Sequence, residues 1–216
     1  MAGVPDGVAV SLHVVGHPVV AAKLAQLRDA TTGTAAFRLL IEELGALLTY
    51  EACRDLPVEA AAVTTPLGVA SGVRVARRIG LVPVLRAGTS MLQGALRLFP
   101  DAQVWHLGVY RDEHRLIPVE YYNRLPPRPT VDLCFVLDPM LATGGSAVAT
   151  VEILRRWGVP DVRFVGVIGA PEGVSAFGGA HPHVPMTLAA VDERLDGRGY
   201  IVPGLGDAGD RQFGTG

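Results

Sequence analysis

The sequence predicts an α/β fold built on a doubly wound, mainly parallel sheet that is flanked by helices. Two observations predict this class. Through residues 81–191, short apolar runs rich in β-branched residues alternate with segments of helical periodicity, which is typical of parallel strands joined by crossover helices. In addition, the apolar run at 131–137 leads through a loop of small residues into a helical pattern, which is the order of a βα unit.

The N-terminal part begins with two helical patterns, at residues 17–29 and from 34 to about 54. Pro18 stands near the start of the first, and Thr34 is the expected N-cap of the second. We interpret both as scaffold or interface helices. Residues 58–80 are Val-rich but interrupted by Pro and Gly, which predicts short strands joined by turns.

The remaining elements alternate along the chain. The periodicity predicts strands at 81–85, 103–110, 131–137, 163–168 and 186–191, and helices at 90–98, 144–157 and 171–177. Residues 114–129 contain four prolines and cannot form a regular helix. We therefore expect a flexible arm over 110–130, or an ordinary surface loop.

Composition bounds the function. A chain of 216 residues fits a single domain over 1–216. The net charge of −2 and a pI of about 6.3 predict no general attraction to nucleic acid or to anionic membranes. The chain has no uncharged apolar run near the ~18 residues of a membrane span. Residues 1–16 lack the basic stretch of a secretory signal. The two cysteines are interpreted as small buried hydrophobic residues, in keeping with a reducing compartment. We therefore expect a cytoplasmic protein.

The loop after residues 131–137 has the chemistry of a phosphate site. Unpaired N–H groups at a helix start, together with the helix dipole, favour an anion. Two glycines allow a close backbone approach, and a Thr and a Ser add hydroxyl donors. The absence of a Lys excludes a Walker loop, while the leading carboxylate could accept hydrogen bonds from sugar hydroxyls. The candidate residues are Asp138, Pro139, Met140, Leu141, Ala142, Thr143, Gly144, Gly145 and Ser146.

Two further segments suggest ligand contacts. Arg86 directly follows a predicted strand and could bind a diphosphate with its planar fork, although a surface arginine at a strand end fits equally well. The tail 199–210 contains a literal G-x-G-x-x-G. We reject a dinucleotide site there, because that motif must open a helix within a βαβ unit. A glycine-dense backbone could instead match the donors and acceptors of a flat base such as uracil; a disordered terminus is the alternative.

Four blocks of this sequence, at 82–88, 110–112, 138–146 and 199–210, together resemble the uracil phosphoribosyltransferases. The 138–146 loop is similar to that of type I phosphoribosyltransferases in general, and the C-terminal block points to uracil. The resemblance implies a type I phosphoribosyltransferase fold with a β-arm or hood. It also implies transfer of ribosyl-5-phosphate from phosphoribosyl diphosphate to N1 of uracil, which gives UMP and diphosphate with Mg²⁺.

The resemblance assigns roles to individual residues. It implies that Arg86 and Arg111 bind the diphosphate and that residues 138–146 hold the ribose and its 5-phosphate. Asp207 would contact both substrates, as a base or as an orienting group, and completes a catalytic set with the two arginines. Mg²⁺ would be carried by the diphosphate, without direct protein ligands. The residues implied to frame uracil are Ile201, Gly206, Asp207 and Ala208.

The sequence departs from the family pattern in places. Pro139 stands where most type I phosphoribosyltransferases have a second acid, and Thr89-Ser90 stands where an apolar residue and Gly are more common. Some family members are activated by GTP and form higher oligomers, so the resemblance implies a GTP effector and a homodimer or higher homo-oligomer. Two alternatives stay open: a phosphoribosyltransferase for another base, and a nucleotide-sensing regulator that binds RNA.

Overall fold

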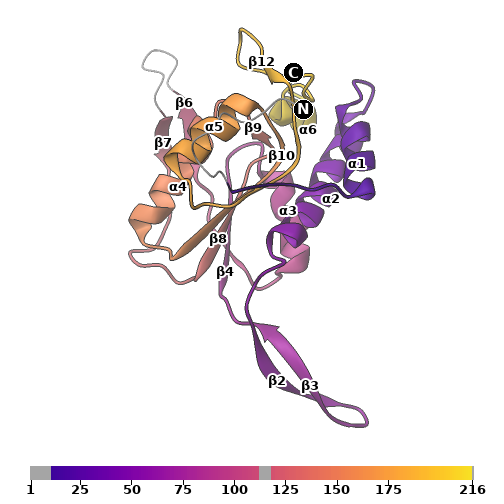
Figure 1. Ribbon diagram of the computed structural model, residues 1–216, viewed down its shortest axis with the longest axis vertical. Helices are drawn as coiled ribbons and strands as arrows, with labels where there is room; N and C mark the ends of the chain where they lie inside the picture. Colours follow the sequence, from indigo (N-terminus) through magenta and orange to yellow (C-terminus); the bar gives the residue numbers. More distant parts are fainter. Residues whose placement is uncertain (1–10, 112–117, 216) are drawn as a thin grey trace.

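A parallel sheet forms the centre of the computed structural model, which describes residues 11–111 and 118–215 (Figure 1). Every strand pair in this sheet is parallel, so the predicted fold class is confirmed. Additional pairing comes from β9 (Met140–Leu141), which lies beside β10. The order of the other strands is β1 (Leu12–Val14), β11 (Met186–Val191), β10 (Asp161–Gly169), β8 (Leu133–Leu137), β4 (Ile79–Pro83) and β5 (Gln103–Val104).

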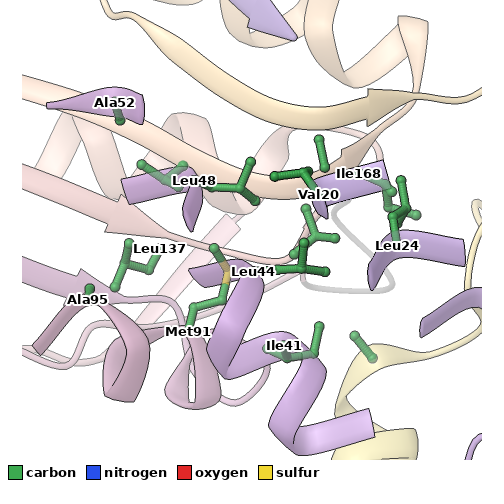
Figure 2. Packing of buried hydrophobic residues seen from close by; sticks show 14 of the residues in the cluster. Val20, Leu24, Ile41, Leu44, Leu48, Ala52, Met91, Ala95, Leu137 and Ile168 are labelled. Carbon is green, nitrogen blue, oxygen red and sulfur yellow. The ribbon is translucent and has the colours of Figure 1, made fainter. Parts of the chain in front are cut away.

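Helices cover both faces of the sheet. The helices α1 (Pro18–Arg28), α2 (Thr34–Ala52) and α3 (Thr89–Leu98) lie on one face, and α4 (Gly145–Trp157) and α5 (Pro171–Ala180) lie on the other (Figure 1). Successive residues of β8 therefore enter different cores: Phe135 packs with the first group and Val136 with the second. Figure 2 shows the first core, where Leu44 and Leu48 of α2 lie near Leu137.

Three antiparallel pairs and a short helix lie outside the central sheet. They are the hairpin of β2 (Val58–Thr65) and β3 (Gly68–Val75), the pair β6 (Gly108–Arg111) and β7 (Pro118–Tyr122), the pair β12 (Arg194–Leu195) and β13 (Ile201–Val202), and α6 (Ala208–Phe213). The β2–β3 hairpin extends far from one end of the molecule, while β6, β12 and α6 lie toward the other end (Figure 1).

The structure corrects three expectations about elements. The N-cap of α2 is Gly33 rather than Thr34. Residues 58–75 form one long hairpin instead of several short strands, because the only interruption is the turn at 66–67. The strand expected at 103–110 divides into β5, in the central sheet, and β6, outside it. Within the arm expected at 110–130, β7 pairs with β6, and residues 112–117 lie outside the described chain.

The C-terminal block also differs from a simple loop. Residues 199–210 contain β13 and the start of α6. The G-x-G-x-x-G sequence does therefore precede a helix, but β12 and β13 are antiparallel and form no βαβ unit. The rejection of a dinucleotide fingerprint stands on that topology. Among the described residues, no helix has the length and apolar character to cross a bilayer.

Candidate active site

The loop from Asp138 to Ser146 connects β8 to α4 at the carboxyl edge of the sheet. It encloses a small cavity of about 100 Å³, lined by Asp138, Met140, Leu141, Ala142, Thr143, Gly144, Gly145, Ser146 and Ala147. Gly144 has a φ of +83° and no side chain caps the helix it precedes. A Cβ at this position would also lie 3.0 Å from the Gly173 carbonyl oxygen. The left-handed backbone and the close approach to α5 thus explain why a glycine stands at this position.

Asp138 begins this loop with a partly buried carboxylate. Its Oδ1 accepts a long hydrogen bond from the Met140 amide, at 3.4 Å. Desolvation raises the pKa of Asp138 to about 7, because burial disfavours the charged form and little else stabilises it. A ligand hydroxyl that donates to this carboxylate would favour the ionised form again.

The loop that carries Arg86 (residues 84–88, here called the Arg86 loop) lies directly against Leu137 at the end of β8, next to the start of the 138–146 loop. The Val84 amide donates to the Leu137 carbonyl (3.0 Å), and the Gly88 amide donates to the Val84 carbonyl (2.9 Å). The contact is so close that a Cβ on Gly88 would lie 2.2 Å from the Leu137 oxygen. The Arg86 side chain is 61% exposed, with one nitrogen 3.4 Å from the Asp210 carboxylate. Its guanidinium is therefore available to a ligand at this edge.

The C-terminal block is held in place by two arginines, Arg28 at the end of α1 and Arg211 within α6. Arg28 forms a bidentate ion pair with Asp192 and donates to the Gly204 carbonyl (2.6 Å). Asp192 in turn accepts from the Gly204 amide (2.8 Å), which fixes both polar groups of that residue. Arg211 donates to the carbonyls of Leu27 and Leu205, at 2.9 and 2.8 Å.

Asp207 is the N-cap of α6, and its Oδ1 accepts from the Asp210 amide at 2.9 Å. This helix passes close to Arg86, because a Cβ on Gly209 would lie 3.7 Å from an Arg86 nitrogen. The loop that carries Arg86 thus contacts the last residue of β8, next to the 138–146 loop, on one side and α6 on the other. The structure thereby brings Arg86, Asp207 and residues 138–146 to one region of the molecule.

The residues expected to frame a base differ in their exposure to solvent. Ile201 and Ala208 are buried, and both belong to the core cluster beneath the site. Their side chains cannot reach a ligand, so only their backbone could. Gly206 is exposed with a φ of +77° and does offer bare backbone. Arg111 lies in β6, at a position whose side chain is outside the described part of the structure.

Sequence reasoning missed the residues that support the site rather than line it. These are Arg28, Asp192, Asp210, Arg211 and Gln212. A signal did exist for Asp192, because an acid directly after the predicted strand at 186–191 must lie at the carboxyl edge of a parallel sheet. Arg211 and Gln212 of α6 gave no such signal, since several of their partners lie more than 100 positions away in sequence.

Comparison with known proteins decides the family. The family model described as uracil phosphoribosyltransferase matches residues 14–215. The chain belongs to the uracil phosphoribosyltransferase family. It is 60% identical to the uracil phosphoribosyltransferase of Roseiflexus castenholzii, over 93% of this chain and 96% of that protein. It is 49% identical to the one from Halalkalibacterium halodurans, over 94% and 98%.

A solved structure agrees with the fold of this family member. The AQ2163 protein from Aquifex aeolicus is 37% identical and superposes with a TM-score of 0.89, over 94% of this chain and 98% of that chain. The relatives match nearly end to end, so the long β2–β3 hairpin and the C-terminal α6 both lie within the family's region of similarity.

Proposed function

We propose that this chain transfers ribosyl-5-phosphate from phosphoribosyl diphosphate to N1 of uracil, which yields UMP and diphosphate. One observation carries the proposal. In a member of this family, the small-residue loop at 138–146, Arg86 and the N-cap of α6 meet at the carboxyl edge of the sheet, which is the usual ligand edge of an open α/β sheet. The alternatives, another base or an RNA-binding regulator, are not favoured by the family relationship.

The 5-phosphate is proposed to bind at the start of α4. The cavity of about 100 Å³ there is lined by backbone amides and by the hydroxyl-bearing residues Thr143 and Ser146. A helix of 13 residues adds the partial positive charge of its N-terminus. Asp138, at the other side of the same cavity, is proposed to accept hydrogen bonds from the ribose hydroxyls.

Arg86 and Arg111 are proposed to bind the diphosphate and to stabilise it as it leaves. Displacement at C1 of the sugar develops positive charge on the ribose and negative charge on the leaving group, so fixed cations at that place lower the barrier. Mg²⁺ bound to the diphosphate would add further charge neutralisation. Because Mg²⁺ usually keeps several waters and takes few protein ligands, it is proposed to arrive with the diphosphate.

Uracil is proposed to lie against the backbone of residues 201–208. Gly206 is exposed, and Asp207 follows it as the N-cap of α6. Positioning N1 in line with C1 of the sugar converts a bimolecular step into an effectively unimolecular one. In this account Asp207 orients the base and the sugar, or takes the N1 proton; the two roles differ in the pH dependence of kcat.

The β2–β3 hairpin supports the prediction of a homo-oligomer. Directly paired residues share a face, and the pairs Val58–Val75 and Ala60–Val73 place apolar side chains on one face, whereas Glu59 pairs with Arg74 on the other. Val69 and Val73 on the apolar face are 77% and 68% exposed. An isolated two-stranded hairpin is marginally stable at best, so we propose that a second copy of the chain covers this face.

The test of the function is turnover with a panel of bases. The protein is incubated with phosphoribosyl diphosphate, Mg²⁺ and uracil, hypoxanthine or guanine in turn, and diphosphate release is measured. UMP formation with uracil alone is expected. Turnover with a purine and none with uracil would overturn the proposal. Addition of GTP to the uracil reaction, with the oligomeric state followed by light scattering, tests the predicted effector in the same preparation.

A further inference from the structure

Gln212 is a completely buried amide in α6, and it lies between two parts of the proposed site. Its Nε2 donates to the Ala87 carbonyl (2.9 Å), and its Oε1 accepts from the Ser90 hydroxyl (2.5 Å). The orientation of the amide follows from chemistry, because a carbonyl can only accept and the nitrogen must therefore face Ala87. A buried amide held by two such bonds is costly to disturb.

Both partners of Gln212 belong to the segment that carries Arg86. Ala87 follows Arg86 directly, and Ser90 lies in the first turn of α3. The main chain of Gln212 is held as well, since Arg38 donates to its carbonyl oxygen at 3.1 and 3.2 Å. The amide is thus a fixed point on α6 to which the Arg86 loop is attached.

Within the part of the chain that the structure describes, Arg86 itself is joined to α6 only by exposed contacts, with the Asp210 carboxylate and with the Phe213 ring, whose centroid lies 6.0 Å from the guanidinium. The Arg86 guanidinium and the Asp210 carboxylate are 3.4 Å apart, and their side chains are 61% and 37% exposed. Exposed ion pairs contribute little to stability and are screened by salt. The Ser90 hydroxyl and the Gln212 amide are buried, so their bond is the contact able to fix the separation of the two segments.

We propose that Gln212 and Ser90 are positioning residues that hold the Arg86 loop in register with the helix that begins at Asp207. Through them, the site for the diphosphate is set relative to the site for the base. The inference rests on the proposed function. It also predicts that the binding of phosphoribosyl diphosphate is affected more than the binding of uracil. The reason is that Arg28, Asp192 and Arg211 hold residues 204–205 without the Gln212 side chain. Loss of the Gln212 amide should therefore displace the Arg86 loop and leave the base segment in place.

The experiment compares Gln212→Met, which keeps the length of the side chain without the two bonds, with the milder Ser90→Ala. We expect Gln212→Met to raise the KM for phosphoribosyl diphosphate about tenfold, which corresponds to about 1.4 kcal/mol. The KM for uracil should change less than about twofold. Ser90→Ala should raise the KM for phosphoribosyl diphosphate about threefold, again with little change in the KM for uracil. The KM of the double variant for phosphoribosyl diphosphate should not exceed that of Gln212→Met alone, as expected for an interacting pair.

Gln103→Met is a control for the loss of a hydroxyl–amide hydrogen bond at an exposed position far from the site. Gln103 accepts a hydroxyl hydrogen bond from Thr130, also at 2.5 Å, but at the amino edge of the sheet, and its loss should leave both KM values unchanged. Thermal unfolding of all variants separates loss of stability from loss of positioning. A purely structural role would lower the melting temperature and the active fraction while both KM values stay at wild type.

The inference is overturned if the KM for phosphoribosyl diphosphate rises less than threefold in Gln212→Met, or if both KM values rise equally. Failure of the proposed function would look different, because the wild-type protein would then make no UMP. In that case calorimetric binding of phosphoribosyl diphosphate alone still tests the inference: an unchanged Kd in folded Gln212→Met overturns it, and a weakened Kd with Gln103→Met unaffected supports it.

Discussion

The two ends of the central sheet are built in opposite ways. At the carboxyl edge, short loops with positive-φ glycines are joined by side chains from distant parts of the chain, as Arg28 and Gln212 illustrate. At the amino edge, the β2–β3 hairpin is regular over eight paired positions, and most of its residues are exposed (Figure 1). The loops at the carboxyl edge are fixed by tertiary hydrogen bonds, whereas the hairpin beyond the amino edge has regular secondary structure with little to pack against.

This structural difference suits the two ends to different roles. A ligand site needs polar groups held within a fraction of an ångström, and the network at the carboxyl edge supplies that rigidity. An exposed apolar hairpin face instead suits association with another chain. Substitutions at the carboxyl edge should therefore affect catalysis, whereas those on the hairpin should affect assembly. The predictions below test that division, from the largest expected effect on catalysis to the smallest.

The largest effect is expected for the arginines assigned to the diphosphate. Arg111→Ala and Arg86→Ala should each lower kcat/KM for phosphoribosyl diphosphate by about 100-fold or more, the range for removal of one group that stabilises developing charge. Uracil binding, measured by calorimetry in the presence of diphosphate, should change far less. An equal loss for both substrates would assign Arg111 to the scaffold.

Gly88→Ala should be nearly as harmful. A Cβ at this position would lie 2.2 Å from the Leu137 carbonyl oxygen and 2.8 Å from the Val84 amide nitrogen, so backbone next to Arg86 must move. Displacement of about 1 Å costs about 100-fold in rate. The control is Gly179→Ala in α5, where nothing lies within 4 Å of the added carbon. Wild-type kinetics for Gly88→Ala would show that the Arg86 loop is not geometrically constrained.

Asp138 should make substrate use depend on pH near neutrality. Its pKa in the ligand-free protein is raised to about 7 by burial, and the ionised form is the acceptor that ribose hydroxyls need. The KM for phosphoribosyl diphosphate should therefore rise about tenfold per pH unit below 7 in the wild type. In Asp138→Asn the KM should be higher and independent of pH over this range. A pH-independent KM in the wild type would contradict the assignment.

The pH dependence of protein stability provides a second measurement on Asp138, and the raised pKa fixes the direction of that dependence. A pKa raised from 3.8 to about 7 means that the folded protein holds this proton more tightly than the unfolded chain does. The corresponding stabilisation is complete below about pH 4 and is lost as the pH rises through 7. Relative to Asp138→Asn, the melting temperature of the ligand-free wild type should therefore fall between pH 4 and 7. A constant difference would show that Asp138 is not desolvated.

The smallest effect on catalysis is expected at the hairpin. Val69→Glu with Val73→Glu should weaken self-association by at least tenfold, measured by analytical ultracentrifugation, because both charges lie on the apolar face. The kinetic constants of each folded chain should change less than about twofold. Val63→Glu places the same charge on the opposite face and is the control. Equal dissociation by Val63→Glu would remove the distinction between the two faces.

The same contrast explains how far the sequence alone could be interpreted. Buried strands such as 133–137 and the 138–146 loop were predictable because their signals are local: an apolar run, small residues and a helix start. The length of the β2–β3 hairpin was obscured by Gly72, which sits inside a strand rather than ending it. The burial of Ile201 and Ala208, and the Ser90–Gln212 bond, depend on tertiary contacts that no local pattern encodes.

The most direct test of the central claim is a crystal structure with UMP, because one ligand then spans both halves of the proposed site. We predict the phosphate at the amides of 143–146 within hydrogen-bond distance, the ribose hydroxyls at Asp138, and the uracil ring against the backbone of 201–208. A base bound away from residues 201–208, or a phosphate outside the 138–146 loop, would contradict the account.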